Sequence, residues 1–408
     1  MSGDAGGFRA GGSSVTSDVI DSDSTGGTSP MPPAPGEPLL TVADLRVQFT
    51  RGGRRINAVN GLSYEMVPGR MMAIIGESGS GKSVSSRALM GLLPPTATIT
   101  GSIRLDGREL IGLGEKEFQK LRGADIAMIF QDPARSLNPT MKIGTQITEA
   151  VRAHADTDKK AAHARAVELL RMVRLPAPER RFHEYPHQLS GGMRQRVMIA
   201  IALAGEPRLL IADEATTALD VTTQAQIMEL LVELRERLGM AVIMISHDLG
   251  LAASYAEDVV VMYAGRAVEH APVRTLFSNV RMPYTRALLG AIPALEREPH
   301  SLLPVTPGQP PDLSALPKGC PFRPRCSNAT DKCVEHPPFL QHEPDHWYAC
   351  WHPAGTELDT APEVTAALAP ATAAELAHHA HDPAHAGDHP VPDHPAGQHP
   401  AVNQGVPR

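Results

Sequence analysis

The middle of the chain alternates between short apolar runs and longer segments that carry apolar residues at helical spacing. Predicted buried strands occupy residues 71–75, 126–130, 209–214 and 241–246. Predicted helices occupy residues 83–93, 143–174, 191–204 and 222–238. This alternation predicts an α/β fold, in which helices cover a mostly parallel sheet.

Strands joined by tight turns lie before and after this region. The segments concerned are 39–49, 58–67 and 101–107 on one side, and 259–262 and 267–269 on the other. A Gly-rich turn at 51–54 joins the first two, and a turn at Gly265 joins the last two. We therefore expect an antiparallel β layer in front of the parallel sheet and a hairpin behind it.

The composition changes at both ends of the chain. Residues 1–38 are rich in Gly, Ser, Asp, Thr and Pro, which predicts a disordered leader before a globular part over 39–292. A Pro- and Gly-rich extension with all four cysteines follows over 293–353, and an Ala-, Pro- and His-rich tail over 354–408 is predicted to be disordered. The tail histidines could hold a metal loosely or be low-complexity sequence only; they are His378, His379, His381, His385, His389, His394 and His399.

A loop of the phosphate-binding pattern G-x-x-x-x-G-K-[ST] follows the first predicted buried strand. It reads Gly76-Glu77-Ser78-Gly79-Ser80-Gly81-Lys82-Ser83 and opens a predicted helix. Glycines let several backbone N–H groups point inward around an anion, and the helix start adds its positive dipole end. Lys82 can reach the outer phosphates of a nucleotide, and the Ser83 hydroxyl can ligate Mg²⁺. The sequence thus predicts a site for a nucleotide such as ATP with Mg²⁺.

Polar residues follow the other buried strands directly. Gln131, Asp213 and His247 stand at the ends of three of them, and the carboxyl ends of parallel strands meet at one edge of a sheet. Asp213 is a candidate Mg²⁺ ligand, and the neighbouring Glu214 could polarise a water for attack on the outer phosphate. The alternative is an ordinary surface turn after a strand.

A second glycine pair lies at a helix start, in Ser190, Gly191 and Gly192. It offers an anion site without a lysine, which suggests a nucleotide held between two copies; alternatively, Ser190 is a plain helix cap. Phe49 could stack on an adenine ring or be a buried strand residue.

Charge and hydropathy limit the classes of function. The formal net charge of −7 argues against a general nucleic-acid binder. No run of about 18 apolar residues is present, so no segment is predicted to span a bilayer. The start of the chain also lacks the apolar region of a signal peptide. The chain could still dock on a membrane protein.

Together these motifs resemble the ATP-binding-cassette family over residues 40–292. The resemblance implies a P-loop NTPase domain with a RecA-like parallel sheet core, an antiparallel β layer and a helical subdomain. It gives Gly76–Ser83 the role of the Walker A loop, Asp213 that of the Walker B aspartate, and Glu214 that of the catalytic base. The remaining implied roles are a Mg²⁺- and water-contacting glutamine at Gln131, a signature sequence at Leu189–Gln195, a D-loop at Ala218–Asp220, a switch histidine at His247 and an adenine-stacking aromatic at Phe49.

Four further segments narrow the resemblance to the ATPase subunits of dipeptide, oligopeptide and nickel importers. They are Phe130–Pro139, Tyr185–Arg196, Pro283–Leu289 and Gly319–Cys326. Gln188 stands where that group more often has Glu. The resemblance implies a second ATPase subunit, identical or paralogous, two membrane permeases and an extracytoplasmic peptide-binding protein, with the chain at the cytoplasmic face of the membrane.

Two rival classes fit the motifs less well. A soluble cassette protein of translation or DNA repair would carry two cassettes or a long coiled-coil insertion, and neither is present in the sequence. A P-loop kinase or GTPase would lack both the signature sequence and the switch histidine.

The cysteines Cys320, Cys326, Cys333 and Cys350 are the only four in the chain, which suggests a single site. A disulfide framework is disfavoured in a reducing compartment. Zinc sites usually contain a tighter Cys pair, whereas an iron–sulfur cluster tolerates looser spacing. The importer group includes members with a [4Fe–4S] cluster in this segment. We expect such a cluster, with Zn²⁺ or free thiols as the alternatives.

Overall fold

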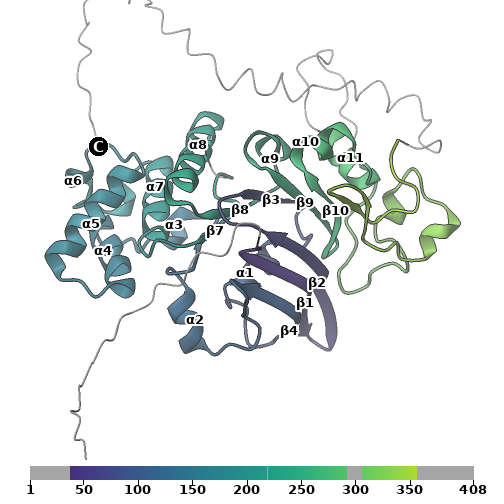
Figure 1. The fold of residues 1–408 in the computed structure, drawn as a ribbon, viewed down its shortest axis with the longest axis horizontal. Coiled ribbons are helices and arrows are strands. Elements are labelled where there is room, and N and C mark those ends of the chain that lie inside the picture. Colours follow the sequence, from purple (N-terminus) through teal and green to yellow (C-terminus); the bar gives the residue numbers. More distant parts are fainter. Residues whose placement is uncertain (1–36, 218, 292–305, 356–408) are drawn as a thin grey trace, which may run out of the picture.

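The computed structural model describes residues 37–217, 219–291 and 306–355. Two β-sheets form its framework, one antiparallel and one mostly parallel, with helices beside them (Figure 1). The predictions made for the leader and for the His-rich tail fall almost entirely outside these residues, as does Ala218 of the predicted D-loop.

The smaller sheet is the predicted antiparallel layer. Its strands are β1 (Leu40–Arg51), β2 (Arg54–Met66), β4 (Ala97–Leu105) and β5 (Arg108–Glu109). They pair in the order β2-β1-β4-β5, and the turn between β1 and β2 uses glycines in left-handed conformations. The sequence analysis placed these strands correctly but made β2 and β4 start four residues too late.

The larger sheet contains five parallel strands. The parallel strands are β3 (Met71–Ile75), β6 (Ile126–Ile129), β7 (Leu209–Asp213), β8 (Ala241–Ser246) and β9 (Asp258–Tyr263). The phosphate-loop strand β3 lies between β9 and β8. Strand β10 (Arg266–Pro272) pairs antiparallel with β9 as the predicted hairpin. The α/β prediction is therefore confirmed.

Alternate residues of the parallel strands point into two separate cores. In β3, Met71, Ala73 and Ile75 belong to one core, and Met72 and Ile74 belong to the other. One core lies against the antiparallel sheet and α1, and the other lies against the helices of the opposite face. Because both faces are buried, these strands read as continuous apolar runs in the sequence.

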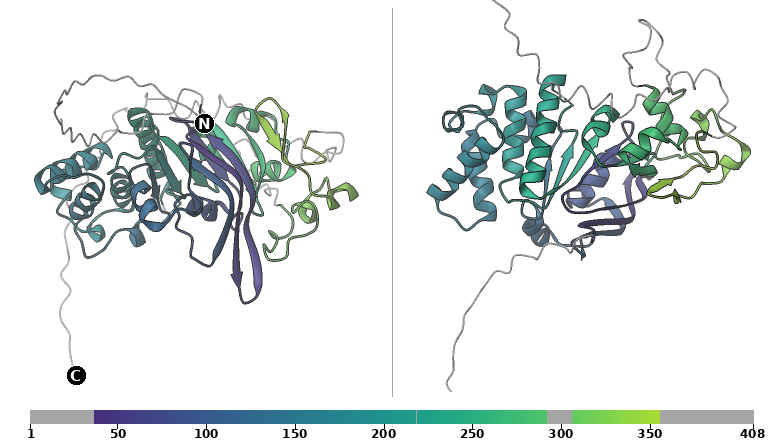
Figure 2. Two further views of the ribbon diagram at one scale, coloured as in Figure 1. Left: turned by 60° about the horizontal axis from the view of Figure 1, so that its bottom comes forward. Right: turned by 45° about the horizontal axis from the view of Figure 1, so that its top comes forward.

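The helices fall into two sets. A helical group lies beside one end of the large sheet and contains α4 (Ile143–His154), α5 (Lys159–Met172), α6 (Pro178–Arg181) and α7 (Gly191–Ala202) (Figures 1 and 2). The others are α1 (Lys82–Leu89), α2 (Glu115–Leu121), α3 (Pro133–Ser136), α8 (Val221–Leu238), α9 (Leu249–Tyr255), α10 (Val273–Ser278) and α11 (Pro283–Gly290). Among the described residues, none of these helices is long and apolar enough to cross a membrane.

Two helix predictions need correction. The predicted helix over 143–174 is two helices, α4 and α5. Asp158 begins the second one, because its side chain accepts a hydrogen bond from the N–H of Ala161 and so caps α5. The helix after the phosphate loop ends at Leu89 rather than at Leu93.

The C-terminal extension adds two strands to the large sheet. Strand β12 (His346–Tyr348) pairs with β10, and β11 (Leu340–Glu343) pairs with β12. The sequence analysis did not predict these strands. They give the sheet the order β11-β12-β10-β9-β3-β8-β7-β6.

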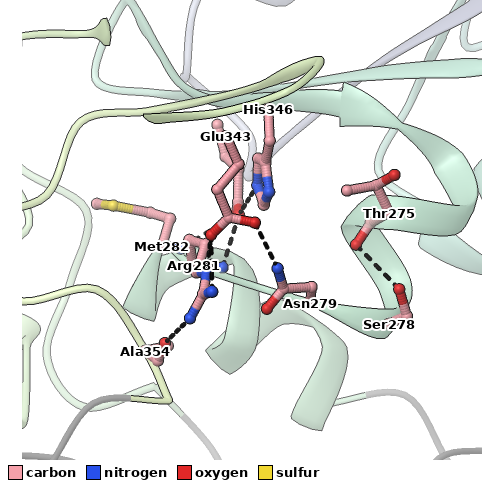
Figure 3. Close-up of polar contacts among 9 residues, drawn as sticks. Thr275, Ser278, Asn279, Arg281, Met282, Glu343, His346 and Ala354 are labelled. Carbon is pink, nitrogen blue, oxygen red and sulfur yellow. Dashed lines mark hydrogen bonds and ion pairs between the residues drawn. The ribbon is translucent and has the colours of Figure 1, made fainter. Parts of the chain in front are cut away.

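Buried polar contacts fasten this extension to the rest of the molecule. His346 forms a fully buried hydrogen bond with the carboxylate of Glu269, which also accepts hydrogen bonds from the N–H groups of Arg281 and Met282. The guanidinium of Arg281 in turn contacts Glu343 at 2.7 Å (Figure 3). The extension therefore has an anchor of its own, on β10 and the segment before α11.

Candidate nucleotide site

The phosphate loop bends sharply at two glycines. Gly76 has a φ of 151°, and a Cβ there would lie 2.2 Å from the carbonyl oxygen of Met262. Gly81 has a φ of 102°, and its Cβ would lie 2.4 Å from the carbonyl oxygen of Ala58. No side chain fits at either position, so the loop requires glycine to curl between β3 and α1.

Lys82 lies folded back inside the loop. Its ammonium donates hydrogen bonds to the carbonyl oxygens of Gly76, at 2.7 Å, and Glu77, at 3.0 Å. Burial lowers the pKa of Lys82, and the negative charges of Glu214, Asp213 and Glu77 act against this decrease. A buried cation thus stands at the centre of the loop, where an anion would be held most strongly.

Ser83 and Asp213 meet at the carboxyl end of the sheet. The Ser83 hydroxyl, at the start of α1, donates a 2.9 Å hydrogen bond to Oδ1 of Asp213, the last residue of β7. Burial raises the pKa of Asp213, and the hydrogen bond from Ser83 opposes the rise. A hydroxyl and a carboxylate oxygen at this separation are hard oxygen donors of the type that Mg²⁺ prefers. The residues present fit a Mg²⁺ ion.

Glu214 is surrounded by the polar residues that follow two neighbouring strands. Its Oε2 accepts hydrogen bonds from the Gln131 amide at 2.6 Å and from the Thr217 hydroxyl at 3.3 Å. Its Oε1 lies 3.8 Å from Nδ1 of His247. The backbone of Glu214 has a left-handed φ of 49°, which costs conformational energy and turns the residue out of the strand direction. The structure thus brings Gln131, Glu214 and His247 together.

Ser190, Gly191 and Gly192 lie at the start of α7, in the helical group. Ser190 caps α7 by accepting a hydrogen bond from the N–H of Met193 at 3.3 Å, as a plain helix cap would. Within the described ranges, no hydrogen bond or ion pair joins these three residues to Gly76–Ser83. This glycine pair therefore does not contact the phosphate loop of the same chain through hydrogen bonds or ion pairs.

Asp220 and Phe49 occupy structural positions as well. Asp220 caps α8 through hydrogen bonds from Thr223, which hold the pKa of its carboxyl below the ordinary value. Phe49 is partly buried on β1, opposite Ile56 and Ala97, and packs against the core beneath the antiparallel sheet.

Comparisons with known proteins agree with this geometry. Residues 59–217 match the family model "ABC transporter", and residues 268–333 match "Oligopeptide/dipeptide transporter, C-terminal region". The chain is 48% identical over 326 residues to the oligopeptide transport ATP-binding protein OppD of Salmonella typhimurium, covering 80% of this chain and 97% of that protein. The chain belongs to the ATP-binding subunits of oligopeptide and dipeptide ABC transporters.

Other members of this family and solved cassettes show the same likeness. The Bacillus subtilis OppD is 47% identical over 335 residues, covering 81% of this chain and 94% of its own. The Mycobacterium tuberculosis OppD is 49% identical over 315 residues, which are 77% of this chain, but the chain spans only about half of that relative (52%). A dimeric ATP-binding cassette in a post-hydrolysis state bound to ADP and Pi has a TM-score of 0.52 and 30% identity, covering 58% of this chain and 99% of its own.

The family's C-terminal region brings the four cysteines to one small pocket. Cys320, Cys326, Cys333 and Cys350 all line it, together with Phe322 and Trp351. Among the described residues, no group of three or more His, Cys, Asp or Glu side chains is arranged to hold a metal ion. Burial raises the pKa of Cys326 to about 11 and that of Cys350 to about 12.

Two residues that contact the phosphate loop were not predicted from the sequence. The guanidinium of Arg325, between two of the cysteines, makes a double hydrogen bond to the carboxylate of Glu77. Tyr284 of α11 also reaches the loop, where its hydroxyl accepts a 2.9 Å hydrogen bond from the Glu77 N–H. Both residues belong to motifs that the sequence analysis singled out, but their spacing gave no sign of this contact.

Proposed function

We propose that the chain is the ATP-hydrolysing motor subunit of an importer for oligopeptides or dipeptides. The observation that carries the proposal is the meeting of Lys82, Ser83, Asp213 and Glu214 at one edge of the parallel sheet. The family to which the chain belongs supports the peptide substrate. The alternatives are import of nickel or another small solute by the same family, and a cassette protein without a permease.

In this proposal, the phosphate loop first changes its internal contacts. Lys82 leaves the carbonyl oxygens of Gly76 and Glu77 and donates to the β- and γ-phosphates of ATP. Ser83 and Asp213 turn their oxygens from each other toward Mg²⁺, which when bound neutralises charge on the phosphates. The backbone N–H groups of the loop and the start of α1 hold the remaining negative charge. Phe49 stacks on the adenine.

Glu214 acts on the attacking water. Its carboxylate orients the water and accepts its proton as the water oxygen attacks the γ-phosphorus in line with the departing ADP oxygen. The Gln131 amide, which already contacts Glu214 at 2.6 Å, orients the same water and reaches the Mg²⁺ coordination sphere. His247 donates a hydrogen bond to the γ-phosphate, whose oxygens carry the charge that develops in the transition state.

The second wall of the site comes from another cassette. Ser190, Gly191 and Gly192 sit exposed or half-exposed at the start of α7 and offer N–H groups to a nucleotide bound in a partner molecule. Two cassettes, identical or paralogous, thus close around two ATP molecules, with Asp220 facing the partner. Hydrolysis removes the link between the two surfaces, and the pair reopens.

The remaining partners follow from the family. Two permeases span the membrane, and the segment after Gln131, which follows the exposed Phe130, passes the motion of the cassettes to them. An extracytoplasmic peptide-binding protein delivers the cargo. The chain then acts as a peripheral subunit at the cytoplasmic face of the cell membrane and binds no nucleic acid.

The experiment replaces Glu214 by Gln, which keeps the shape of the side chain and removes the base. We expect ATP turnover to fall about 10²- to 10⁴-fold, with binding of a fluorescent ATP analogue retained. Unchanged turnover would remove Glu214 from its role. Purification from solubilised membranes with subunit identification tests the importer itself, and recovery of no multi-spanning partner contradicts it.

We also propose that the four cysteines hold a [4Fe–4S] cluster. All four thiols line one small pocket, and a [4Fe–4S] cluster takes four thiolates, one at each iron. When bound, the cluster would supply structural cross-linking or redox sensitivity. The raised pKa of each of the Cys320, Cys326 and Cys350 thiols means that binding must release protons from these residues.

Chemical analysis of anaerobically prepared protein tests the cluster. We expect about four iron and four acid-labile sulfide per chain, and loss of both in Cys350→Ser. Stoichiometric zinc without sulfide would contradict the cluster, and four titratable thiols without metal would show a metal-free site.

A further inference from the structure

A salt bridge joins the cysteine-bearing extension directly to the phosphate loop. Nη1 and Nη2 of Arg325 donate hydrogen bonds of 2.7 and 3.0 Å to the two carboxylate oxygens of Glu77. The Arg325 side chain is 6% exposed and that of Glu77 is 24% exposed. A bidentate pair of this burial fixes both distance and orientation, and water screens it little.

Arg325 is itself held firmly. Its Nε donates a 3.0 Å hydrogen bond to the carbonyl oxygen of Pro307, and its Nη1 also reaches the hydroxyl of Tyr263 at 3.3 Å. The guanidinium lies over the rings of Tyr263 and Phe322. The side chain therefore has one position, and it presents the carboxylate of Glu77 with a rigid partner.

Glu77 is fixed on three sides. Its carboxylate meets Arg325, its N–H donates to the hydroxyl of Tyr284, and its carbonyl oxygen accepts from the ammonium of Lys82. Two of the three partners lie beyond residue 280 and come from the C-terminal part of the chain. The third is the lysine that holds the phosphates, so a displacement of Glu77 reaches Lys82 through a single contact.

The other end of this connection is the cysteine pocket. Arg325 ends the short 3₁₀ turn Arg323–Arg325, which lies between Cys320 and Cys326, and its N–H donates to the carbonyl oxygen of Phe322. Cys320, Phe322 and Cys333 are buried in the main core. Movement of Cys320 or Cys326 therefore moves the backbone that carries Arg325.

We propose that Arg325 is a positioning residue for the phosphate loop and transmits the state of the cysteine pocket to nucleotide binding. The proposal rests on ATP binding at Gly76–Ser83 but not on the nature of any group held by the cysteines. An intact pocket holds Arg325 against Glu77 and keeps the loop ready for phosphate. A rearranged pocket moves Arg325 away from Glu77, and the phosphate loop loses this fixed contact.

The simplest rival is that Arg325 only fastens the extension to the rest of the molecule. The extension has an independent anchor, since β12 pairs with β10 and Arg281 binds Glu343. Arg281→Gln is therefore a matched control, which loses a partly buried arginine contact of the extension away from the phosphate loop. A purely structural role would make the two variants alike.

The first experiment compares Arg325→Gln, Arg325→Lys and Arg281→Gln in the full-length protein. For Arg325→Gln we expect the Kd for a fluorescent ATP analogue and the KM for ATP to rise about tenfold, with kcat within about twofold. Arg325→Lys keeps the charge and should recover part of the loss. Nucleotide affinity in Arg325→Gln equal to that of the wild type or of Arg281→Gln would overturn the positioning role.

The second experiment tests the link to the cysteines with a double-mutant cycle. Cys350→Ser alters the pocket far along the chain from Arg325 and should raise the Kd for the ATP analogue in the wild-type background. In the Arg325→Gln background the same change should have little further effect. Additive effects would overturn the link. If Cys350→Ser does not fold, as judged by thermal unfolding, Cys333→Ala replaces it in the same cycle.

Failure of this proposal can be distinguished from failure of the proposed function. Failure of ATP to bind the wild type at all would refute the motor assignment, whereas normal binding with additive effects refutes only the link. The metal and sulfide content of each variant is measured in parallel.

Discussion

The side-chain amide of Gln131 donates a 2.6 Å hydrogen bond to the carboxylate of Glu214. The two residues follow β6 and β7, which are neighbours in the sheet, so the contact crosses between two strand ends. It places the amide on the carboxylate that we propose as the base. The segment after Gln131 leads into α3 and the helical group, which makes this bond a connection between hydrolysis and that part of the molecule.

Removing this amide should impair chemistry more than binding. We expect Gln131→Ala to lower the kcat for ATP about 10²-fold, because the water and Glu214 lose their orienting partner. The Kd for ATP should change little, since Lys82 and the loop remain. Steady-state ATPase assays and analogue binding measure both. Gln119→Ala, on the exposed face of α2, is the control. Equal kcat in the two variants would exclude an orienting role for Gln131.

Ser190 offers a test of the shared site that leaves the helix cap in place. Asp is as good an N-cap as Ser and suits the helix dipole, so Ser190→Asp should keep the thermal stability. Its negative charge would face the γ-phosphate of the partner's ATP, and turnover should fall more than about tenfold. Ser190→Asn, which caps without charge, is the control. ATP-dependent dimerisation of Ser190→Asp that matched Ser190→Asn would contradict the two-molecule site.

Gly76 should not tolerate even a methyl group. In Gly76→Ala the Cβ meets the Met262 carbonyl oxygen at 2.2 Å, in addition to left-handed strain, so ATP binding should be lost and stability should fall by about 1–3 kcal/mol or more. Gly69→Ala separates the two effects, because its φ is +72° and no atom lies within 4 Å. It should lose about 1 kcal/mol and bind ATP normally. Urea unfolding and analogue binding report both, and normal ATP binding by Gly76→Ala would refute the close approach.

His270 should make stability depend on pH. It lies half-buried on β10, stacked on Trp347, and burial together with nearby His346 lowers its pKa to about 4, against the pull of Asp345. Below a pH of about 6.5 the unfolded chain binds a proton that the folded chain does not, so stability is lost as the pH falls toward 4. The full effect is about 3 kcal/mol.

Unfolding in urea at pH 7.5 and pH 5 measures this dependence. His270→Phe retains the stacked ring and should lose less stability on acidification than the wild type. His183→Phe, at an exposed position, should behave as the wild type does. An identical loss in all three proteins would show that His270 does not carry the dependence.

The sequence predicted the nucleotide edge of the sheet well because its signals are local. Each parallel strand is an apolar run, and the residue that follows it is fixed at the same edge whatever the packing of the helices. Gln131, Asp213 and His247 could therefore be placed together before any distance was known. The break at Asp158 was also readable, since Asp before a helical run is a typical cap.

The C-terminal part was harder to predict because its contacts are distant in sequence. Strands β11 and β12 are only four and three residues long, and β10, with which β12 pairs, lies more than seventy residues earlier. His346 and Glu269 look like surface residues in the sequence, but each is fully buried through the other. Arg325 is likewise held by the carboxylate of Glu77, which lies 248 positions earlier in the chain.

The added hairpin also decides which strand ends the sheet. Without β12, the outer N–H and C=O groups of β10 would be open to strands of other molecules and invite aggregation. With it, the outermost strand is β11, which is four residues long, mostly exposed and followed at once by Pro344. A short strand stopped by proline is a poor template for further pairing. At this end of the sheet a neighbouring copy of the chain therefore meets only a short strand, which limits pairing between molecules.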